Sequence, residues 1–266
     1  MILTKTSSDP SVCSIEERSV LLTMLLSFIF LFLSPLHAKT IEADYSVEFG
    51  IVGQVGKVHA TLKSDDTYYM IDANVSALGI AKAVTDDLKE RHISKGHVVK
   101  GRLIADMYQM IKSYGKYTST TIYRVDHKKK RVTRQYKKWK YDKLIIDRNA
   151  KLGYYGKDDM MTLFLNLHLH IKAQTTPKKY LYKVVGAARK NGRVDVMIPT
   201  RKDLQEIKGL VGQGEPGDWF TTVIMHRQLY QSSQGELDVR IGQEGLVEKA
   251  VLKDLIFFGD VRIIKQ

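Results

Sequence analysis

The fold class is decided by residues 45–62, YSVEFGIVGQVGKVHATL. Tyr45, Val47 and Phe49 alternate with polar residues, and the same alternation resumes after Gly56. A period of two places one set of side chains on one face of a strand, so this stretch predicts two strands. The three glycines between the runs suit a turn or a bulge, and a β-hairpin is the simplest interpretation.

The same alternation recurs along the chain. It predicts further strands at residues 68–74, 117–125, 132–139, 180–185, 193–198, 237–241 and 246–264, the last broken near Gly245 and Gly259. Asn191-Gly192 is expected to supply the positive φ angles of a tight turn between two of them. We therefore predict a mainly β protein with a single curved antiparallel sheet forming a roll or partial barrel.

One or two short helices are expected beside the sheet. Residues 158–171 begin with two aspartates that could cap a helix and continue with a broad apolar stripe. The alternation of leucines at 163, 165, 167 and 169 also allows a strand here. Residues 80–88 and 201–210 are weaker helical stretches.

An uncharged apolar run near the N-terminus predicts export. Residues 20–34 read VLLTMLLSFIFLFLS, a length that suits a signal-peptide core and is short for a membrane span. Ala38 offers a small residue for cleavage, so residues 1–38 are interpreted as a signal peptide, with an uncleaved N-terminal anchor as the alternative. Residues 39–266 are then one β-rich domain, periplasmic or otherwise exported, tethered to the inner membrane if the signal stays.

Cysteine and charge usage constrain the chemistry of that domain. Cys13, the only cysteine, precedes the apolar run, so the exported part has no thiol for a disulfide, a metal or a nucleophile. Two of the 42 basic and three of the 29 acidic residues lie in the first 38 positions, which leaves 40 against 26, a net charge of +14. Anionic lipid, lipopolysaccharide or acidic glycan are natural partners, and the compartment disfavours nucleic acid.

Several motifs resemble the exported bacterial family called domain of unknown function 3108. They are Tyr45–Gly50 with its following glycines, Ala77-Leu78-Gly79, Asp86-Asp87 before Ser94-Lys95-Gly96, and the closing stretch that ends in Phe258-Gly259-Asp260-Val261. Residues 104–105, where the family has a proline, and the loop 209–217 depart from its pattern. The resemblance implies an envelope-facing β-roll, a turn into a strand at Ser94-Lys95-Gly96, and no catalytic residues to transfer.

No catalytic, cofactor-binding or metal-binding residues are predicted from motifs. Residues 212–217 match G-x-G-x-x-G, but a strand-like run follows where a dinucleotide site needs a helix, so a plain loop is expected. His168 and His170 would share a face only on a strand, and a turn is expected between His92 and His97. Asp158-Asp159 is interpreted as a helix cap and Asp86-Asp87 as a turn, because adjacent side chains point apart.

The strongest local signal is the basic segment 127–143, HKKKRVTRQYKKWKYDK. Cations interleaved with aromatic rings suit an anionic surface with an apolar edge. The alternative is a solvated hairpin with Tyr136 or Trp139 in the core. The candidate binding residues are Lys128, Lys129, Lys130, Arg131, Arg134, Tyr136, Lys137, Lys138, Trp139 and Lys140.

These observations favour an envelope protein that binds or handles an anionic component, without enzymatic activity. A structural or scaffolding partner that docks other envelope proteins through strand edges is the second hypothesis. A hydrolase is the third, and no residue pattern supports it.

Overall fold

The hairpin expected at residues 45–62 is present in the computed structural model, which describes residues 39–187, 191–225, 235–255 and 259–266. β1 (Lys39–Phe49) and β2 (Gly53–Ser64) are antiparallel, with Tyr45 opposite Val58 and Val47 opposite Gly56. The predicted apolar faces of the two strands therefore coincide.

The described residues form one sheet of 15 strands. The strands after β2 are β3 (Tyr68–Ala77), β4 (Lys89–Val99), β5 (Arg102–Tyr114), β6 (Tyr117–Asp126), β7 (Arg131–Lys140), β8 (Lys143–Lys151), β9 (Asp158–Asp159), β10 (Lys178–Val185), β11 (Arg193–Ile198), β12 (Trp219–Ile224), β13 (Glu236–Ile241), β14 (Val247–Leu255) and β15 (Gly259–Lys265). In the same described ranges three helices accompany them, α2 (Gly79–Val84), α3 (Met160–His170) and α4 (Arg201–Val211).

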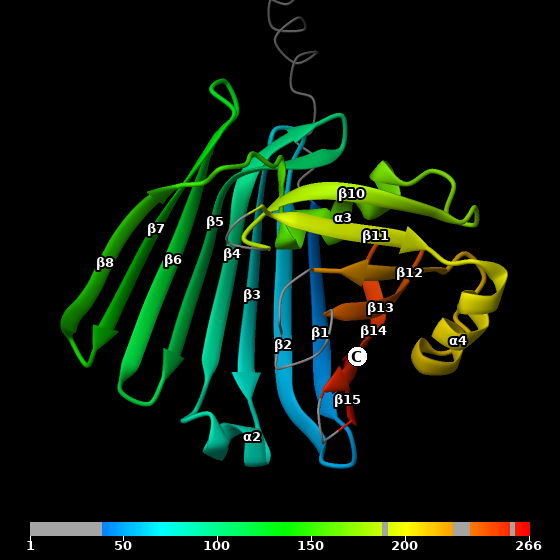
Figure 1. The fold of residues 1–266 in the computed structure, drawn as a ribbon, viewed down its shortest axis with the longest axis horizontal. Helices are drawn as coiled ribbons and strands as arrows, with labels where there is room; N and C mark the ends of the chain where they lie inside the picture. Colours follow the sequence, from blue (N-terminus) through cyan, green and yellow to red (C-terminus); the bar gives the residue numbers. More distant parts are fainter. Residues whose placement is uncertain (1–38, 188–190, 226–234, 256–258) are drawn as a thin grey trace, which may run out of the picture. The chain divides into compact units, whose positions relative to one another are not determined.

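Sequential antiparallel pairing explains nearly the whole topology. The order runs from β8 down to β1, continues through β15 down to β10, and ends at β9, which pairs in parallel with β10. The first and last long strands are neighbours, because β1 pairs with β15. The mainly β, curved antiparallel sheet predicted from the alternation is thus confirmed (Figure 1).

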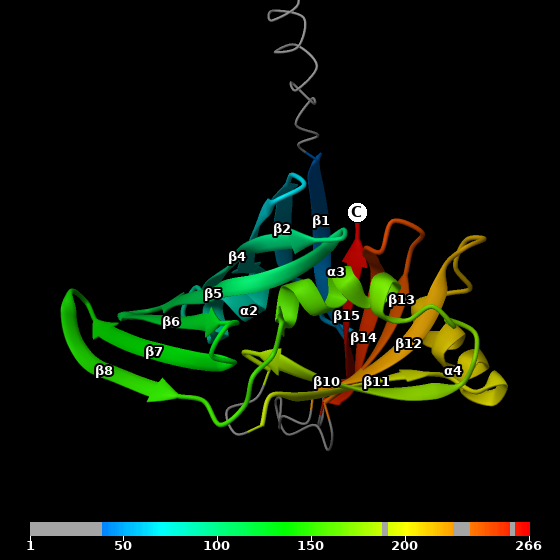
Figure 2. The ribbon, with the colours of Figure 1, turned by 90° about the horizontal axis from the view of Figure 1, so that it is seen from above.

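α3 lies in the hollow of the curled sheet (Figure 2). Its buried Leu163 and Leu167 pack with Val196 of β11 and Val239 of β13 in the largest core cluster. Its other side reaches the opposite part of the sheet, where Met161 and Leu165 pack against Tyr69 and Leu103. Burying apolar surface on both sides of one helix is what joins the two halves of the sheet.

α4 covers the other face of the same strands. Phe220 of β12 packs with Ile207 and Val211 of α4, while Trp219 and Val223 of β12 belong to the cluster around α3. All six residues of β12 are buried as a result.

Several local predictions are confirmed. The predicted helix within residues 158–171 is present as α3, and Asp159 of β9 caps it by accepting from the backbone N–H of Met161 and Thr162. The break near Gly245 and Gly259 separates β13, β14 and β15. Asp86 and Asp87 occupy a turn with positive φ, and residues 212–217 form a loop that leads into β12.

Other local predictions are wrong. Residues 94–96 lie inside β4, where a bulge and not a turn follows Lys95. The helix expected at 80–88 ends at Val84. In the connection between β10 and β11, Gly192 has positive φ, as the predicted turn requires. Lys190 lies outside the described residues, so the tight turn expected at residues 190–192 stays a prediction.

The predicted signal at residues 1–38, its cleavage after Ala38 and Cys13 also lie outside the described residues. Ala38–Gln266 form one compact unit. Within the described ranges, every helix is too short or too polar to cross a membrane.

Candidate functional site

The ten candidate residues predicted from the basic segment do not form one compact patch. Lys128, Lys129 and Lys130 lie in the turn before β7, and Lys140 is its last residue. Ten strand residues span roughly 33 Å at about 3.3 Å per residue. The predicted cluster is therefore a stripe along the whole of β7. Its two ends lie where the strands of the sheet begin and end, at the top and the bottom of Figure 1.

Three side chains of the stripe share one face of β7. Arg134, Tyr136 and Lys138 pair with Tyr123, Thr121 and Ser119 of β6, which places them on one face. The core contact comes from Val132, which is fully buried with Tyr108 and Tyr123. Neither Tyr136 nor Trp139 enters the core as the alternative expected, because both side chains stay half-buried.

At one end of the stripe, three other segments lie along the same edge, which is formed by strand ends and turns at the bottom of Figure 1. We call this edge the α2 rim and define it as residues 50–52, 79–89, 115–116 and 138–145. Backbone hydrogen bonds connect three of the pieces, from Gly115 N to Asp86 O at 2.7 Å and from Tyr141 N to Lys116 O at 2.7 Å. Next to the rim, Leu78 N donates to Val55 O at 2.8 Å and so joins the start of α2 to β2. The rim is thus an edge built from segments far apart in the sequence.

Exposed apolar side chains concentrate on the α2 rim. Among the described residues, seven of the ten exposed large hydrophobic side chains lie there: Ile51, Val52, Ile80, Val84, Tyr141, Leu144 and Ile145. Ile51 is completely exposed, and the side chain of Val84 is 75% exposed. Exposed apolar side chains that gather along one end of a sheet mark a candidate interaction surface, because each gains free energy when it leaves water.

Cations surround these apolar side chains. Six lysines stand against three aspartates on the rim: Lys82, Lys89, Lys116, Lys138, Lys140 and Lys143 against Asp86, Asp87 and Asp142. Lys82 and Lys89 share Asp87 at 3.8 and 3.1 Å. The other exposed lysines, at 116, 140 and 143, form no ion pair within the part of the chain that the structure describes.

Lys138 is held on the rim by aromatic rings. Its Nζ lies 4.3 Å from the ring centroid of Tyr117 and 5.5 Å from that of Tyr114. The hydrogen bond to Tyr114 raises the pKa of Lys138. This lysine therefore remains a cation next to two tyrosines at the point where β5 and β7 end and β6 begins.

The opposite edge of the sheet, which we call the far rim, comprises the turns 65–67, 100–101 and 127–130. Its carboxylates organise the turns themselves: Asp65 accepts from the backbone of Thr67 and Tyr68 at 2.7 Å, and Asp126 accepts from Lys129 N at 2.9 Å. Only Tyr68 and Val99 are exposed large apolar residues beside these turns. The far rim therefore has exposed lysines, but only these two exposed large apolar side chains lie beside them.

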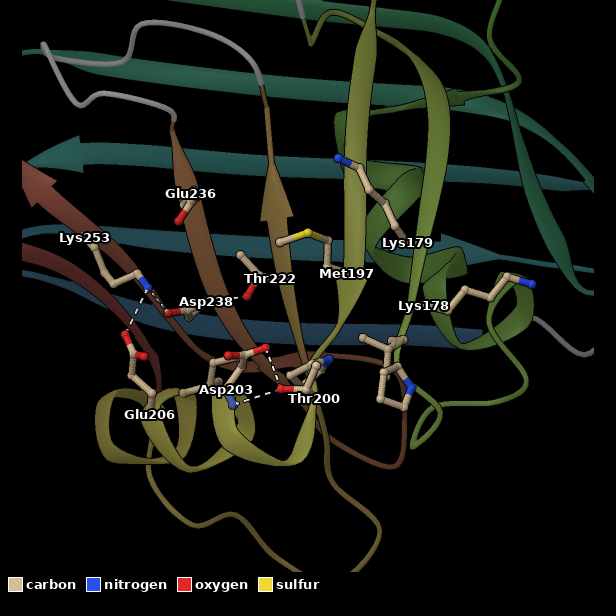
Figure 3. A pocket seen from close by; sticks show the side chains of 14 residues that line it. Lys178, Lys179, Met197, Thr200, Asp203, Glu206, Thr222, Glu236, Asp238 and Lys253 are labelled. Atoms are coloured by element: carbon tan, nitrogen blue, oxygen red, sulfur yellow. Dashed lines mark hydrogen bonds and ion pairs between the residues drawn. The ribbon is translucent and has the colours of Figure 1, made fainter.

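A pocket of about 350 Å³ lies between α4 and strands β10 to β14 (Figure 3). Its buried Asp238 accepts from Thr222 Oγ1 at 2.6 Å and pairs with Lys253 Nζ at 3.1 Å. Burial lowers the pKa of Lys253, but the hydrogen bond to Asp238 and the negative charges of Asp238, Glu206 and Glu236 together raise it by more, so the net shift is upward. Lys179, also in the lining, pairs with Asp195 at 2.7 Å. Each of these two lysines already forms an ion pair with an aspartate, so neither is available to bind an anion in the pocket.

The buried aspartates before α3 serve the fold. Asp158 accepts from Asn166 Nδ2 at 2.6 Å and lies 3.2 Å from His170 Nε2. Asp159 accepts from Ser94 Oγ at 2.5 Å, and its burial raises its pKa to about 6. The interpretation of this pair as a helix cap is confirmed for Asp159, whereas Asp158 links α3 to the sheet.

Two of the histidines take positions that the sequence analysis did not predict. His92 and His97 lie on one continuous strand, β4, so the turn expected between them is wrong. His92 contacts Tyr108 Oη at 2.9 Å and Glu90 Oε2 at 3.2 Å. The hydrogen bond between His92 and Glu90 lowers the pKa of Glu90 to about 2.

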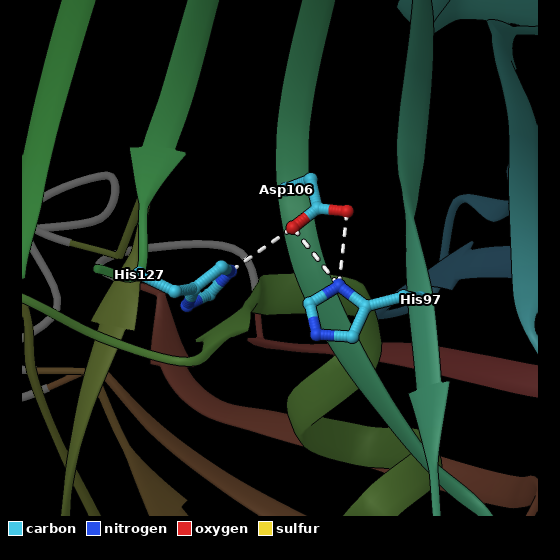
Figure 4. A group of neighbouring side chains, drawn as sticks. All are labelled: His97, Asp106 and His127. Carbon is cyan, nitrogen blue, oxygen red and sulfur yellow. Dashed lines mark hydrogen bonds and ion pairs between the residues drawn. The ribbon is translucent and has the colours of Figure 1, made fainter.

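His97 converges with Asp106 of β5 and with His127 of the β6–β7 turn (Figure 4). One ligand atom from each of the three lies within 4.8 Å of the others. Sequence analysis missed this group because its members are separated by 9 and 21 positions and match no spaced motif. His168 and His170 lie two apart on α3, so they do not share the face that a strand would have given them.

Comparison with known proteins finds similarity to a solved structure. No family model matches the chain, and no curated protein matches it. A solved structure from Brucella abortus, described as a β-barrel-like protein of domain of unknown function DUF1849, has a TM-score of 0.43 and 7% sequence identity. The match covers 87% of this chain and 96% of that one, and its description assigns no activity.

Proposed function

We propose that this is an exported envelope protein whose α2 rim binds the surface of an anionic lipid bilayer. The observation that carries the proposal is the coincidence of exposed apolar side chains with unpaired lysines on one edge of the sheet. Apolar side chains insert below the headgroups while lysine ammonium groups stay among the phosphates. A lipid surface is flat, charged and apolar underneath, and it matches a rim better than it matches a pocket.

The expected free energies are sufficient for reversible binding. A large aliphatic side chain contributes roughly 1.5–3 kcal/mol when it leaves water, and a lysine near an anionic bilayer about 1 kcal/mol. Two inserted side chains and three lysines amount to several kcal/mol before the cost of immobilising the protein. The binding should therefore depend on anionic lipid and weaken at high salt.

Vesicle flotation of the full chain tests the proposal. Anionic and neutral vesicles are compared at a lipid concentration where half of the wild-type protein floats with neutral lipid, because the uncharged run 20–34 can bind both kinds equally. One variant replaces Lys116, Lys140 and Lys143 by Gln, and the matched control replaces Lys128, Lys129 and Lys130 by Gln. Both remove three exposed lysines, from opposite rims of the same sheet.

The α2-rim variant should lose most of the preference for anionic vesicles, at least fivefold in partitioning, while the far-rim variant keeps most of it. Equal losses in both variants would show that net charge and not the rim attracts the lipid. Salt-insensitive binding to both vesicle types would contradict the electrostatic part of the proposal.

A scaffold is the second candidate, and the free edge of β8 favours it. Among the described residues β8 pairs only with β7, so one side of a nine-residue strand has unpaired backbone groups that another chain could extend. Its charged side chains at 143, 147, 148 and 151 discourage such pairing. A stoichiometric protein partner captured from solubilised membranes and lost after Ile146→Pro would favour the scaffold.

A further inference from the structure

The geometry points to a divalent transition-metal site formed by His97, Asp106 and His127, for which Zn²⁺ is the natural probe. Two imidazole nitrogens and one carboxylate oxygen are donors that Zn²⁺ accepts in proteins. This inference does not depend on the proposed function of the α2 rim, since the three residues lie at the other end of the strands.

The three side chains already contact one another. His97 Nδ1 lies 3.0 Å from both carboxylate oxygens of Asp106. His127 Nε2 lies 3.1 Å from Asp106 Oδ1, and the two imidazole rings meet edge to face with centroids 5.4 Å apart. A tetrahedral Zn²⁺ with ligand atoms about 2.0–2.2 Å away holds them roughly 3.4 Å from one another. The contacts of Asp106 with the two histidines would therefore lengthen slightly, and the two histidine nitrogens already lie within 4.8 Å of each other.

A β-bulge places Asp106 in this position. Lys95 is opposite Met107 and Gly96 is opposite Ala105, so Asp106 is the extra residue of β5. A bulge redirects a side chain out of the ordinary alternation and is common next to functional sites. Gly96 is required there, because a Cβ at this position would lie 1.9 Å from the carbonyl oxygen of Ile104.

A second layer of contacts orients His127. Its Nδ1 lies 2.8 Å from Tyr155 Oη, which leaves Nε2 directed at Asp106 and at Ala105 O, 3.1 Å away. When Nε2 binds a metal, the proton moves to Nδ1 and is donated to the tyrosine oxygen. Metal-binding histidines usually have such a partner on the second nitrogen.

The site is open to solvent. The side chains of His97, Asp106 and His127 are 36%, 44% and 23% exposed. Three protein ligands with one open side leave room for a water molecule in the fourth position, as in sites that exchange or use their metal. The bound ion would also tie the β6–β7 turn to β4 and β5 near the point where β5 leaves its pairing with β6.

Zinc titration of the tag-free full chain tests the inference. The protein is stripped with a chelator and titrated with Zn²⁺ against a chromophoric competitor, and thermal unfolding is followed with and without the metal. The site variants are His97→Gln and His127→Gln. The control is His59→Gln, which removes a histidine that also contacts an aspartate, Asp44, at 2.8 Å, with no second histidine.

Wild type and H59Q should bind one zinc ion per chain and unfold at a higher temperature with zinc. Each site variant should bind at least tenfold more weakly and lose the thermal shift. The absorption of a Co²⁺ substitute gives an independent readout of four-coordinate nitrogen and oxygen ligation. Wild type without stoichiometric binding, or site variants that bind as tightly as H59Q, would overturn the inference; circular dichroism of the variants verifies that they are folded.

Discussion

β12 and β8 belong to one sheet and have opposite environments. All six residues of β12 are buried, because α3 covers one of its faces and α4 the other. Eight of the nine residues of β8 are exposed. Hydrogen bonding to a neighbouring strand is common to both, so the difference comes from what covers their faces.

Because of this difference, we expect the strands around α3 to determine the stability of the fold, and β8 with its neighbouring turns to determine what the surface binds. The strands around α3 carry the large fully buried side chains, whereas β8 and the turns next to it carry lysines and uncovered apolar residues. Substitutions near α3 should therefore change the free energy of unfolding, and substitutions on β8 or the α2 rim should change binding.

The largest effect is expected from Leu167→Ala. Leu167 is fully buried in the cluster that α3 forms with β10 to β14, and truncation of such a leucine costs about 2–5 kcal/mol through lost burial and the cavity that remains. Leu144→Ala on β8, where the side chain is 44% exposed, should change the free energy of unfolding by less than about 0.5 kcal/mol. Urea unfolding measures both. Comparable losses would mean that β8 is part of the core.

The second-largest effect is a pH dependence of the free energy of unfolding, caused by Asp159 at the start of α3. Burial raises the pKa of Asp159 to about 6 from 3.8, so its protonated form is favoured in the folded protein. Stability contributed by this group is complete below pH 4 and is lost as the pH rises through 6, by about 3 kcal/mol. Asp159→Asn should flatten this part of the curve, because the amide oxygen can still accept from Met161 and Thr162.

Chemical denaturation between pH 4 and 8 measures that curve. If the free energy of unfolding of the D159N variant falls between pH 4 and 6 as much as that of the wild type, other groups cause the pH dependence. Asp159 would then not be protonated in the folded protein over this range.

The smallest effect is expected on the exposed strand. Lys137 of β7 and Asp147 of β8 form an ion pair at 3.4 Å, and both side chains are at least one third exposed. Solvent-exposed pairs contribute about 0–1 kcal/mol, so Asp147→Asn should leave the unfolding midpoint nearly unchanged. A loss above 2 kcal/mol would contradict the assignment of this region to surface chemistry.

The sequence allowed the fold to be predicted where alternation and turn residues agree. The β1–β2 hairpin follows from apolar positions at a period of two, and α3 follows from a capping aspartate before an apolar stripe. The β4–β5 turn was missed because it uses Lys100 with positive φ before Gly101, where the usual signature is Asn-Gly. Gly96 suggested a turn, but it serves a bulge inside a strand.

The candidate sites were less predictable, because they depend on which strand ends meet. The basic segment was identified, but its division between two rims follows from the position of β7 in the sheet. Ile51, Ile80 and Leu144 are ordinary apolar residues in sequence, and their place near turns was the only available signal. Asp106 joins the two histidines through a bulge, and no spacing rule reveals it.

Depth measurement with an environment-sensitive fluorophore tests the central claim, that the α2 rim is the edge that meets an anionic bilayer. With Cys13→Ser as background, the label is attached at Leu144→Cys on the α2 rim or at Tyr68→Cys near the far rim. On anionic vesicles the label at 144 should shift to the blue and be quenched by lipid-borne quenchers, while the label at 68 stays in water. Equal burial of both labels, or burial of the label at 68 alone, would contradict the account.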